Sequence, residues 1–328
     1  MVNRTASQFN SDRYYKHFKT YEHLVTMLYA GLSGVSSLRE LSTILLACEG
    51  RIGHLNLKHF PKRSTLSDAN ANRCSAVFAH IYYCLFESYR SFLSDSSPSS
   101  LPIKHLKIVD STTISLFSTI LKGVGRHPIN GKKKGGIKMH TMINALQDVP
   151  CLVRFTSAAT HDHTFLKDLN LEKGSFVVFD KTYNDYLQYL QWTQDDIYFV
   201  TRQKENAVYQ SMEEFELSDT TSDAVLKDER IYIKKNDSHI ELRRVAYWDS
   251  EKEKVYGFIS NNFLIAPDKI AAIYKQRWQI ETMFKRLKQN FPLKYFLGDN
   301  QNAIEIQIWC GLIIQLLMLV VQRRTKRK

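Results

Sequence analysis

The chain has 328 residues, and 45 Lys and Arg against 33 Asp and Glu leave a formal net charge of +12 at pH 7. Hydrophobic residues make up 44% of the chain, which excludes a disordered polyelectrolyte and predicts two or three folded domains. The excess of positive charge indicates a polyanionic partner. Five cysteines without a C-x-x-C pair exclude a disulfide framework and a zinc ribbon. With no apolar stretch of signal-peptide length among the first residues, we expect a cytoplasmic protein.

Residues 1–97 are predicted to form a helical DNA-binding domain. Apolar residues recur at spacings of three and four along Tyr21–Leu32, Ser37–Cys48 and Ala76–Phe92. A stretch rich in Ser and Pro at 94–102 favours neither helix nor burial, so we expect a linker there. A short turn between two helices is compatible with helix-turn-helix DNA binding, although most helical pairs are ordinary parts of a bundle.

Residues 98–300 change to the pattern of a mixed α/β sheet, the predicted catalytic core. Five runs are predicted to be strands: His105–Val109, Gly136–Ile143, Cys151–Thr156, Phe176–Phe179 and Ile197–Thr201. A helix is expected between the last two runs. A charged segment at about 203–253 reads as a β-rich insertion, after which 256–260 return to the sheet. One long helix is predicted over 267–290.

Residues 301–328 are predicted to form a C-terminal helix and a basic tail. The apolar segment Ile304–Val321 has about the minimum length for a membrane span, and a buried helix of a large domain has the same hydropathy. It contains Glu305, Gln307 and Gln315, and nothing else in the chain suggests a bilayer. We therefore expect a core helix and no membrane partner.

Two aspartates each follow a short apolar run directly. Asp110 comes after Leu106–Val109 and Asp180 after Phe176–Phe179, so each carboxylate is expected where a buried strand leaves the sheet. Ligands and active sites of α/β sheets collect at that edge. A strand-ending Asp in an ordinary turn is the competing interpretation for either residue alone.

A third acid is predicted to lie on the long helix. Tyr274, Arg277, Glu281 and Lys288 stand at offsets 0, 3, 7 and 14, which places them on one helix face within an arc of about 60°. The apolar residues of the same segment lie directly beside this stripe, so the helix should dock with Glu281 directed at the sheet edge. The alternative is an amphipathic surface helix with scattered charges.

These segments together resemble a known family. The runs Val-Asp-Ser-Thr at 109–112 and Phe-Asp-Lys-Thr-Tyr at 179–183, with the helix just described, are similar to DDE transposases of bacterial insertion sequences, in the branch with a Tyr-Arg-Glu-Lys signature. The resemblance implies a ribonuclease-H-like core with a β-rich insertion between the second and third acids. It also implies that the protein cleaves DNA at the ends of its own insertion sequence and joins these ends to target DNA. The expected DNA partner is double-stranded and carries the terminal inverted repeats. The expected reaction proceeds through a hairpin intermediate in a synaptic homodimer.

Three carboxylates without a His or Cys set predict an oxygen-only site, which favours Mg²⁺, with Mn²⁺ as a substitute, over zinc. Two such ions can clamp an in-line displacement at phosphorus. We expect Asp110 to bridge both ions, and Asp180 and Glu281 to bind one ion each. The sequence His161-Asp162-His163 lacks a third ligand at suitable spacing and reads as a turn.

Several side chains are candidates for DNA contacts. Arg277, Lys288 and Tyr274 would bind phosphates beside the acids, although Arg277 and Glu281 could also form an ordinary surface ion pair. A Gly-broken loop between two predicted strands contains Lys132, Lys133 and Lys134 and is expected to contact phosphates without reading sequence.

Two aromatic residues are candidates for stacking on an extruded base. They are Tyr256, which stands where some relatives have Trp, and Trp278; core packing is equally compatible with both. Three other activities stay open beside a transposase. They are a metal-dependent endonuclease of the same fold, a catalytically silent DNA-binding regulator, and a membrane protein with a soluble head.

Overall fold

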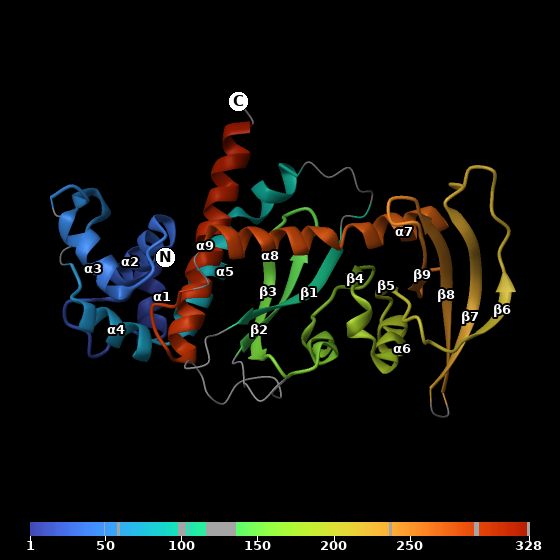
Figure 1. The fold of residues 1–328 in the computed structure, drawn as a ribbon, viewed down its shortest axis with the longest axis horizontal. Coiled ribbons are helices and arrows are strands. Elements are labelled where there is room, and N and C mark those ends of the chain that lie inside the picture. Colours follow the sequence, from blue (N-terminus) through green and yellow to red (C-terminus); the bar gives the residue numbers. More distant parts are fainter. Residues whose placement is uncertain are drawn as a thin grey trace.

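The structure is a computed structural model. It describes residues 1–48, 50–57, 60–97, 103, 105–115, 136–235, 238–291 and 295–326. The molecule is elongated, with the N-terminal helices at one end, a β-rich extension at the other and the central sheet between them (Figure 1).

The first five strands have the order and directions of a ribonuclease-H-like core. They are β1 (Leu106–Ser115), β2 (Gly136–Asn144), β3 (Pro150–Ser157), β4 (Phe176–Phe179) and β5 (Tyr198–Arg202). In space they follow the order β3-β2-β1-β4-β5, with antiparallel pairing from β3 to β1 and parallel pairing from β1 through β4 to β5. The predicted fold class is confirmed.

Strand residues alternate between two apolar layers, as the pleat requires. Ile108 of β1 packs with α5 (Ser75–Asp95), α7 (Pro267–Lys275), α8 (Trp278–Asn290) and α9 (Gln301–Lys326). Its neighbour Val109 packs on the opposite face with α6 (Tyr186–Gln194). Asp110 has the same parity as Ile108, so it belongs to the face that α8 covers.

The insertion extends the same sheet. Its strands are β6 (Gln210–Glu214), β7 (Val225–Lys235), β8 (Ser238–Asp249) and β9 (Lys254–Ser260). Because β9 pairs antiparallel with β5, the described strands form one nine-stranded sheet that ends at β6. The predicted β-rich character of this segment and its return to the sheet are confirmed.

A buried ion pair anchors the insertion to the chain that leads into α7. Arg243 donates to both carboxylate oxygens of Asp228, at 2.8 and 2.6 Å, and both side chains are almost fully buried. The same guanidinium donates to the carbonyl oxygens of Asn262 and Ile265. The β7–β8 hairpin thereby holds the segment from which α7 and α8 start.

The N-terminal region contains α1 (Val2–Gln8), α2 (Thr20–Ser33), α3 (Leu38–Ala47) and α4 (Arg63–Asn72) before α5. The sequence did not predict α1 and α4. The segment that forms α4 is strongly polar and buries only Leu66, Ala69 and Asn70, so it carries little apolar periodicity.

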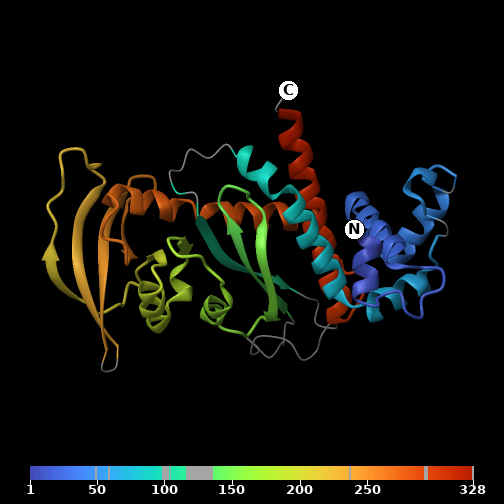
Figure 2. The same cartoon turned by 180° about the vertical axis from the view of Figure 1, so that it is seen from behind.

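The last helix of the N-terminal region packs on the sheet. The Tyr82 hydroxyl of α5 donates to the Pro150 carbonyl at 2.7 Å, and its ring contacts Trp309 of α9. Figure 2 shows α5 and α9 side by side along this end of the sheet. The domain boundary at residue 97 stays a prediction, and the structure adds that α5 shares the core of the sheet.

The C-terminal helix α9 is enclosed by other elements over most of its apolar length. It is the one helix in the described part of the chain that is long and apolar enough to cross a membrane, and 61% of its apolar window is buried. Its neighbours include α2, α4 and α5. This packing supports the prediction of a core helix.

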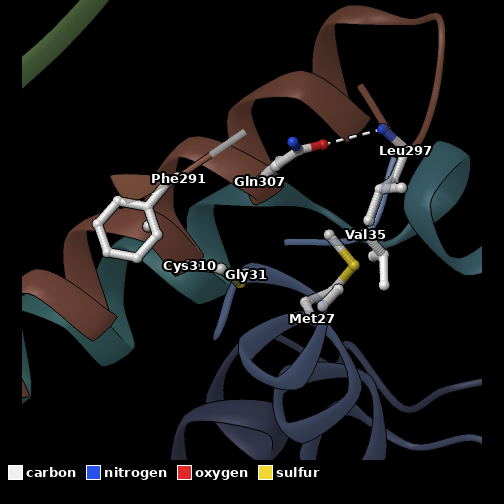
Figure 3. Close-up of a pocket in the computed structure, with 9 residues that line it drawn as sticks. Met27, Gly31, Val35, Phe291, Leu297, Gln307 and Cys310 are labelled. Carbon is white, nitrogen blue, oxygen red and sulfur yellow. Dashed lines mark hydrogen bonds between the residues drawn. The ribbon is translucent and has the colours of Figure 1, made fainter. Parts of the chain in front are cut away.

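Small residues let α2 and α9 approach closely. A side chain at Gly31 would place its Cβ 2.7 Å from the Ile314 methyl group. Around this contact lies a cavity of about 20 Å³, where Gln307 accepts a hydrogen bond from the Leu297 N–H at 2.9 Å (Figure 3). The N-terminal helices are therefore packed directly on the helix that ends the chain.

The prediction of one continuous helix over 267–290 was wrong. Helix α7 ends at Lys275 and α8 begins at Trp278. At the break, the Arg277 N–H bonds to the Tyr274 carbonyl and the Gln279 N–H to the Gln276 carbonyl, a tightened i to i−3 pattern. Arg277 thus sits at a helix junction, where its side chain is not restricted to the face calculated for a regular helix.

Candidate active site

Asp110 and Asp180 lie side by side at one edge of the parallel strands. The parallel register of β1 and β4 pairs Val109 with Phe179, and each aspartate is the next residue along the chain. The strands then diverge: β4 ends at Phe179, whereas β1 continues to Ser115. The prediction that the first strand ends at Asp110 was therefore wrong, because β1 stays paired with β2 beyond it.

The guanidinium of Arg277 links the first acid to the third. One terminal nitrogen lies 3.2 Å from Asp110 Oδ2 and the other lies 2.7 Å from Glu281 Oε1. Arg277 is only 8% exposed, so the i,i+4 pair with Glu281 is not the ordinary surface pair that the sequence left open. Glu281 of α8 is thereby held toward the edge of the sheet.

The protonation of Asp110 reflects this crowding. Burial raises the pKa of the Asp110 carboxyl to about 7. The hydrogen bond from the Ser111 N–H, at 2.8 Å, and the Arg277 charge act in the opposite direction. The nearby carboxylates of Asp180 and Glu281 raise the pKa further. In the metal-free protein the Arg277 charge therefore does not offset the cost of burying an anionic Asp110.

We expect Asp110→Asn to stabilise the metal-free protein at pH 8 and to leave its stability unchanged near pH 4. A folded-state pKa of about 7, above the unfolded value near 3.8, means that stability is lost as pH rises between these values. The asparagine removes this loss, which is about 2–4 kcal/mol. Chemical denaturation in EDTA at both pH values measures the difference. An equal effect of the substitution at pH 4 and pH 8 would contradict the assignment.

The donor set fits a divalent cation. Carboxylate oxygens are the ligands that Mg²⁺ and Mn²⁺ prefer, and a cationic guanidinium already lies between two of these carboxylates. Within the described ranges, no three Asp, Glu, His or Cys side chains are close enough to hold an ion in this conformation. In this structure the Arg277 guanidinium is the cation that Asp110 and Glu281 share.

A fourth acid, Asp162, adjoins the site, whereas the sequence pattern assigned it only to a turn. Its Oδ1 accepts a hydrogen bond from the Ser111 hydroxyl at 2.7 Å and lies 3.1 Å from the buried Lys138 ammonium. His140, fully buried, stands 3.8 Å away, and burial lowers the pKa of this imidazole to about 4. The turn predicted at 161–163 leads into the 3₁₀ helix η2 (Asp162–Asp168). Only the strand pairing brings Asp162 to Ser111.

The other members of the predicted helix stripe have different environments. Lys288 donates to the Thr113 carbonyl of β1 at 3.2 Å, so it lies along the same edge as the acids. Tyr274 is buried, with its ring 4.8 Å from Phe258 and 5.7 Å from the Arg277 guanidinium. In this structure the Tyr274 ring packs against the Arg277 guanidinium. A contact between Tyr274 and DNA stays a prediction.

Both candidate stacking aromatics lie beside the acids. The Arg202 guanidinium, 4.0 Å from Asp180, stands 5.4 Å from the centre of the Tyr256 ring. Trp278 is 48% exposed, and the Lys252 ammonium lies over its ring at 4.8 Å. Lys252 also lies 6.0 Å from the Tyr256 ring. The two rings therefore share a cationic neighbourhood, and Trp278 is too exposed for core packing.

Two predicted basic segments contribute differently. Lys132, Lys133 and Lys134 lie outside the described residues. In the C-terminal tail, Arg323 is buried and donates to the carbonyl oxygens of Leu93, Leu146 and Gln147. Arg323 therefore ties α9 to α5 and to the turn after β2, and it does not extend toward a phosphate.

Comparison with known proteins identifies the family of this chain. The family described as Transposase DDE domain matches residues 103–317, well over half of the chain. A domain of unknown function matches residues 1–58. Among solved structures, a chain of the cryo-EM structure of the piggyBac transposase synaptic complex with hairpin DNA matches at a TM-score of 0.44 and 12% identity, covering 99% of this chain and 73% of that one. That similarity is too low to carry an argument.

Related sequences come from bacterial insertion sequences. A Sinorhizobium fredii protein named as transposase y4zB is 30% identical over 268 residues, covering 80% of this chain and 72% of its own. A Synechocystis sp. protein named as the transposase of insertion sequence element IS4SA is 27% identical over 261 residues, covering 78% and 70%. The chain belongs to the DDE transposases of bacterial insertion sequences and is a DNA transposase.

Proposed function

We propose that Asp110, Asp180 and Glu281 are the catalytic carboxylates of this transposase, and that it cleaves the ends of its own insertion sequence and joins them to target DNA. One observation carries the proposal. A single buried guanidinium, that of Arg277, bonds to Asp110 on β1 and to Glu281 on α8, and Asp180 directly follows the adjoining strand β4. This contact, and the position of Asp180 after the strand next to Asp110, support the assignment of all three acids to one site.

The family depends on divalent metal ions, and we assign two Mg²⁺ ions to these acids, with Mn²⁺ as a substitute. Asp110 would bind both ions, and Asp180 and Glu281 one each. When bound, the ions activate the attacking oxygen and stabilise the leaving 3′-oxygen. When Arg277 no longer pairs with Asp110 and Glu281, its guanidinium can bind a DNA phosphate. The planar guanidinium is suited to bidentate contact with phosphate.

The surrounding side chains suit a distorted duplex end. Lys288 and Lys252 would provide positive charge along the DNA strand. Tyr256 and Trp278 offer ring faces to a base displaced from the stack. These features support a hairpin intermediate at the transposon end. We further propose that the N-terminal helices bind the terminal inverted repeats and that two copies act together in a synaptic homodimer on the nucleoid.

The test is a strand-cleavage assay with the full-length protein and a duplex that carries the element's terminal repeats. Reactions with Mg²⁺, Mn²⁺ or EDTA are resolved on a denaturing gel. We expect metal-dependent nicks followed by hairpins that migrate as products of doubled length. Nicks without hairpins or joined products indicate an endonuclease of the same fold. A duplex that is bound and never cut indicates a DNA-binding regulator and overturns the proposal.

A further inference from the structure

A groove of about 590 Å³ opens next to the candidate active site. It is lined by segments 161–163, 181–182 and 204–206. Two contacts join it to the site: Lys181 directly follows Asp180, and Asp162 accepts a hydrogen bond from Ser111. A DNA strand with one phosphate at Asp110 and Asp180 can therefore continue into this groove.

One wall of the groove carries two imidazole rings. The rings of His161 and His163 are stacked, with centroids 5.6 Å apart and an interplanar angle of 23°. Asp162 lies between these histidines in the sequence and forms an ion pair with Lys138. The Lys138 ammonium also donates to the Thr160 carbonyl at 2.6 Å. Lys138 is 6% exposed, so the carboxylate that lines the groove has a fixed and neutralising partner.

The opposite wall is cationic. Lys181 and Lys204 both line the groove, and the one acid on this wall, Glu205, is already paired with Lys254 at 3.1 Å and faces Lys181 at 3.9 Å. An aromatic wall facing a cationic wall is the arrangement with which proteins bind single-stranded nucleic acid, because bases stack on rings while phosphates follow the positive charge. Histidine serves as such a stacking surface.

We propose that this groove binds a single-stranded DNA segment that continues past the scissile phosphate, with its phosphates on Lys181 and Lys204 and a base against the His161–His163 pair. The inference rests on the proposed function, since Asp110 and Asp180 define where the scissile phosphate lies. The groove thus holds one strand apart from the duplex at the point of cleavage.

Binding of fluorescein-labelled oligothymidylate and of a duplex of equal length is measured by anisotropy in EDTA, which keeps cleavage out of the experiment. We expect His163→Ala to weaken binding of the single strand by about 5-fold or more and to affect the duplex much less. His239→Ala, which removes an exposed imidazole of β8, is the matched control and should leave both affinities unchanged. Equal weakening of both DNA forms, or no weakening, overturns the assignment.

The role of the lysines has its own signature. Lys204→Ala should lower the slope of log affinity against log salt for the single strand by about 0.7, the value for one lost phosphate contact. Lys269→Ala, an exposed lysine of α7, removes the same charge elsewhere and should leave the slope unchanged. Equal slopes for wild-type and Lys204→Ala proteins contradict the proposal.

Photo-cross-linking of the wild-type protein removes any dependence on the folding of variants. A 5-iodouridine placed next to the cleavage position should cross-link to the peptide that contains His161 and His163. A cross-link only to other peptides overturns the groove assignment, even while the protein cuts DNA normally. If the wild-type protein gives this cross-link but does not cut the duplex with Mg²⁺, the groove assignment stands and the proposed catalytic function fails.

Discussion

Asp110→Ala, Asp180→Ala and Glu281→Ala are each expected to reduce strand cleavage on the order of 10³-fold or more, because each removes an oxygen ligand from a site whose members act as a unit. DNA binding in EDTA should stay within about 2-fold of wild type, since the phosphate contacts come from cations. The cleavage assay described above and anisotropy on the same duplex measure the two quantities.

The matched control for these variants is Glu172→Ala, which removes an exposed carboxylate elsewhere on the catalytic core. It should cut DNA at the wild-type rate. A variant of any of the three acids that keeps full cleavage would remove that residue from the site. Because Asp110 is destabilised when charged, its variants should lose cleavage while the metal-free protein gains stability, a combination that general unfolding cannot produce.

Asp228→Ala is expected to lower the free energy of unfolding by about 3–5 kcal/mol, because it leaves the Arg243 guanidinium buried without its carboxylate. The side chains of Arg243 and Asp228 are 5% and 4% exposed, so solvent cannot replace the lost partner. Denaturant unfolding at neutral pH measures the change. DNA cleavage by this variant should also decrease, because Arg243 holds the segment that leads into α7 and α8.

The same hairpin provides the control pair. Arg230 and Glu241 form an ion pair at 2.7 Å with side chains 36% and 39% exposed, so Glu241→Ala should cost no more than about 1 kcal/mol. The double variant Asp228→Leu with Arg243→Met replaces both charges by apolar groups and should recover much of the stability lost by Asp228→Ala. A similar cost for Asp228→Ala and Glu241→Ala would show that burial does not set the energy of the inner pair.

For Asp110 and Asp180, local sequence patterns predicted the strands but not how these strands pair. The apolar runs before Asp110 and Asp180 predict two buried strands, and burial on both faces gives parallel strands this continuous apolar character. Strand order and register were not predictable from those runs. They arise because β1 pairs with β2 on one side and β4 on the other, which puts the two aspartates on neighbouring strands at the same level.

The third acid shows where helical periodicity is insufficient. The spacing of Glu281 and Lys288 correctly indicates one face of α8, and both side chains reach atoms at the edge of the sheet through Arg277 or directly. The tightened turn at Gln276 and Arg277 was not predictable, because that segment has no Gly or Pro to mark a break. This junction places the Arg277 side chain between Asp110 and Glu281.

By itself, the amino-acid sequence determined a mixed α/β sheet and the β-rich character of the insertion, and it predicted three candidate acids, because strand periodicity and residue type are local properties. The ribonuclease-H-like class came from the resemblance to DDE transposases. The tertiary structure alone decided that Arg277 pairs with two of those acids, that Asp162 joins them through Ser111, and that two histidines and two lysines form one groove. These relations depend on strand register and on the packing of α8, and contacts between segments that distant leave no periodic signal in the chain.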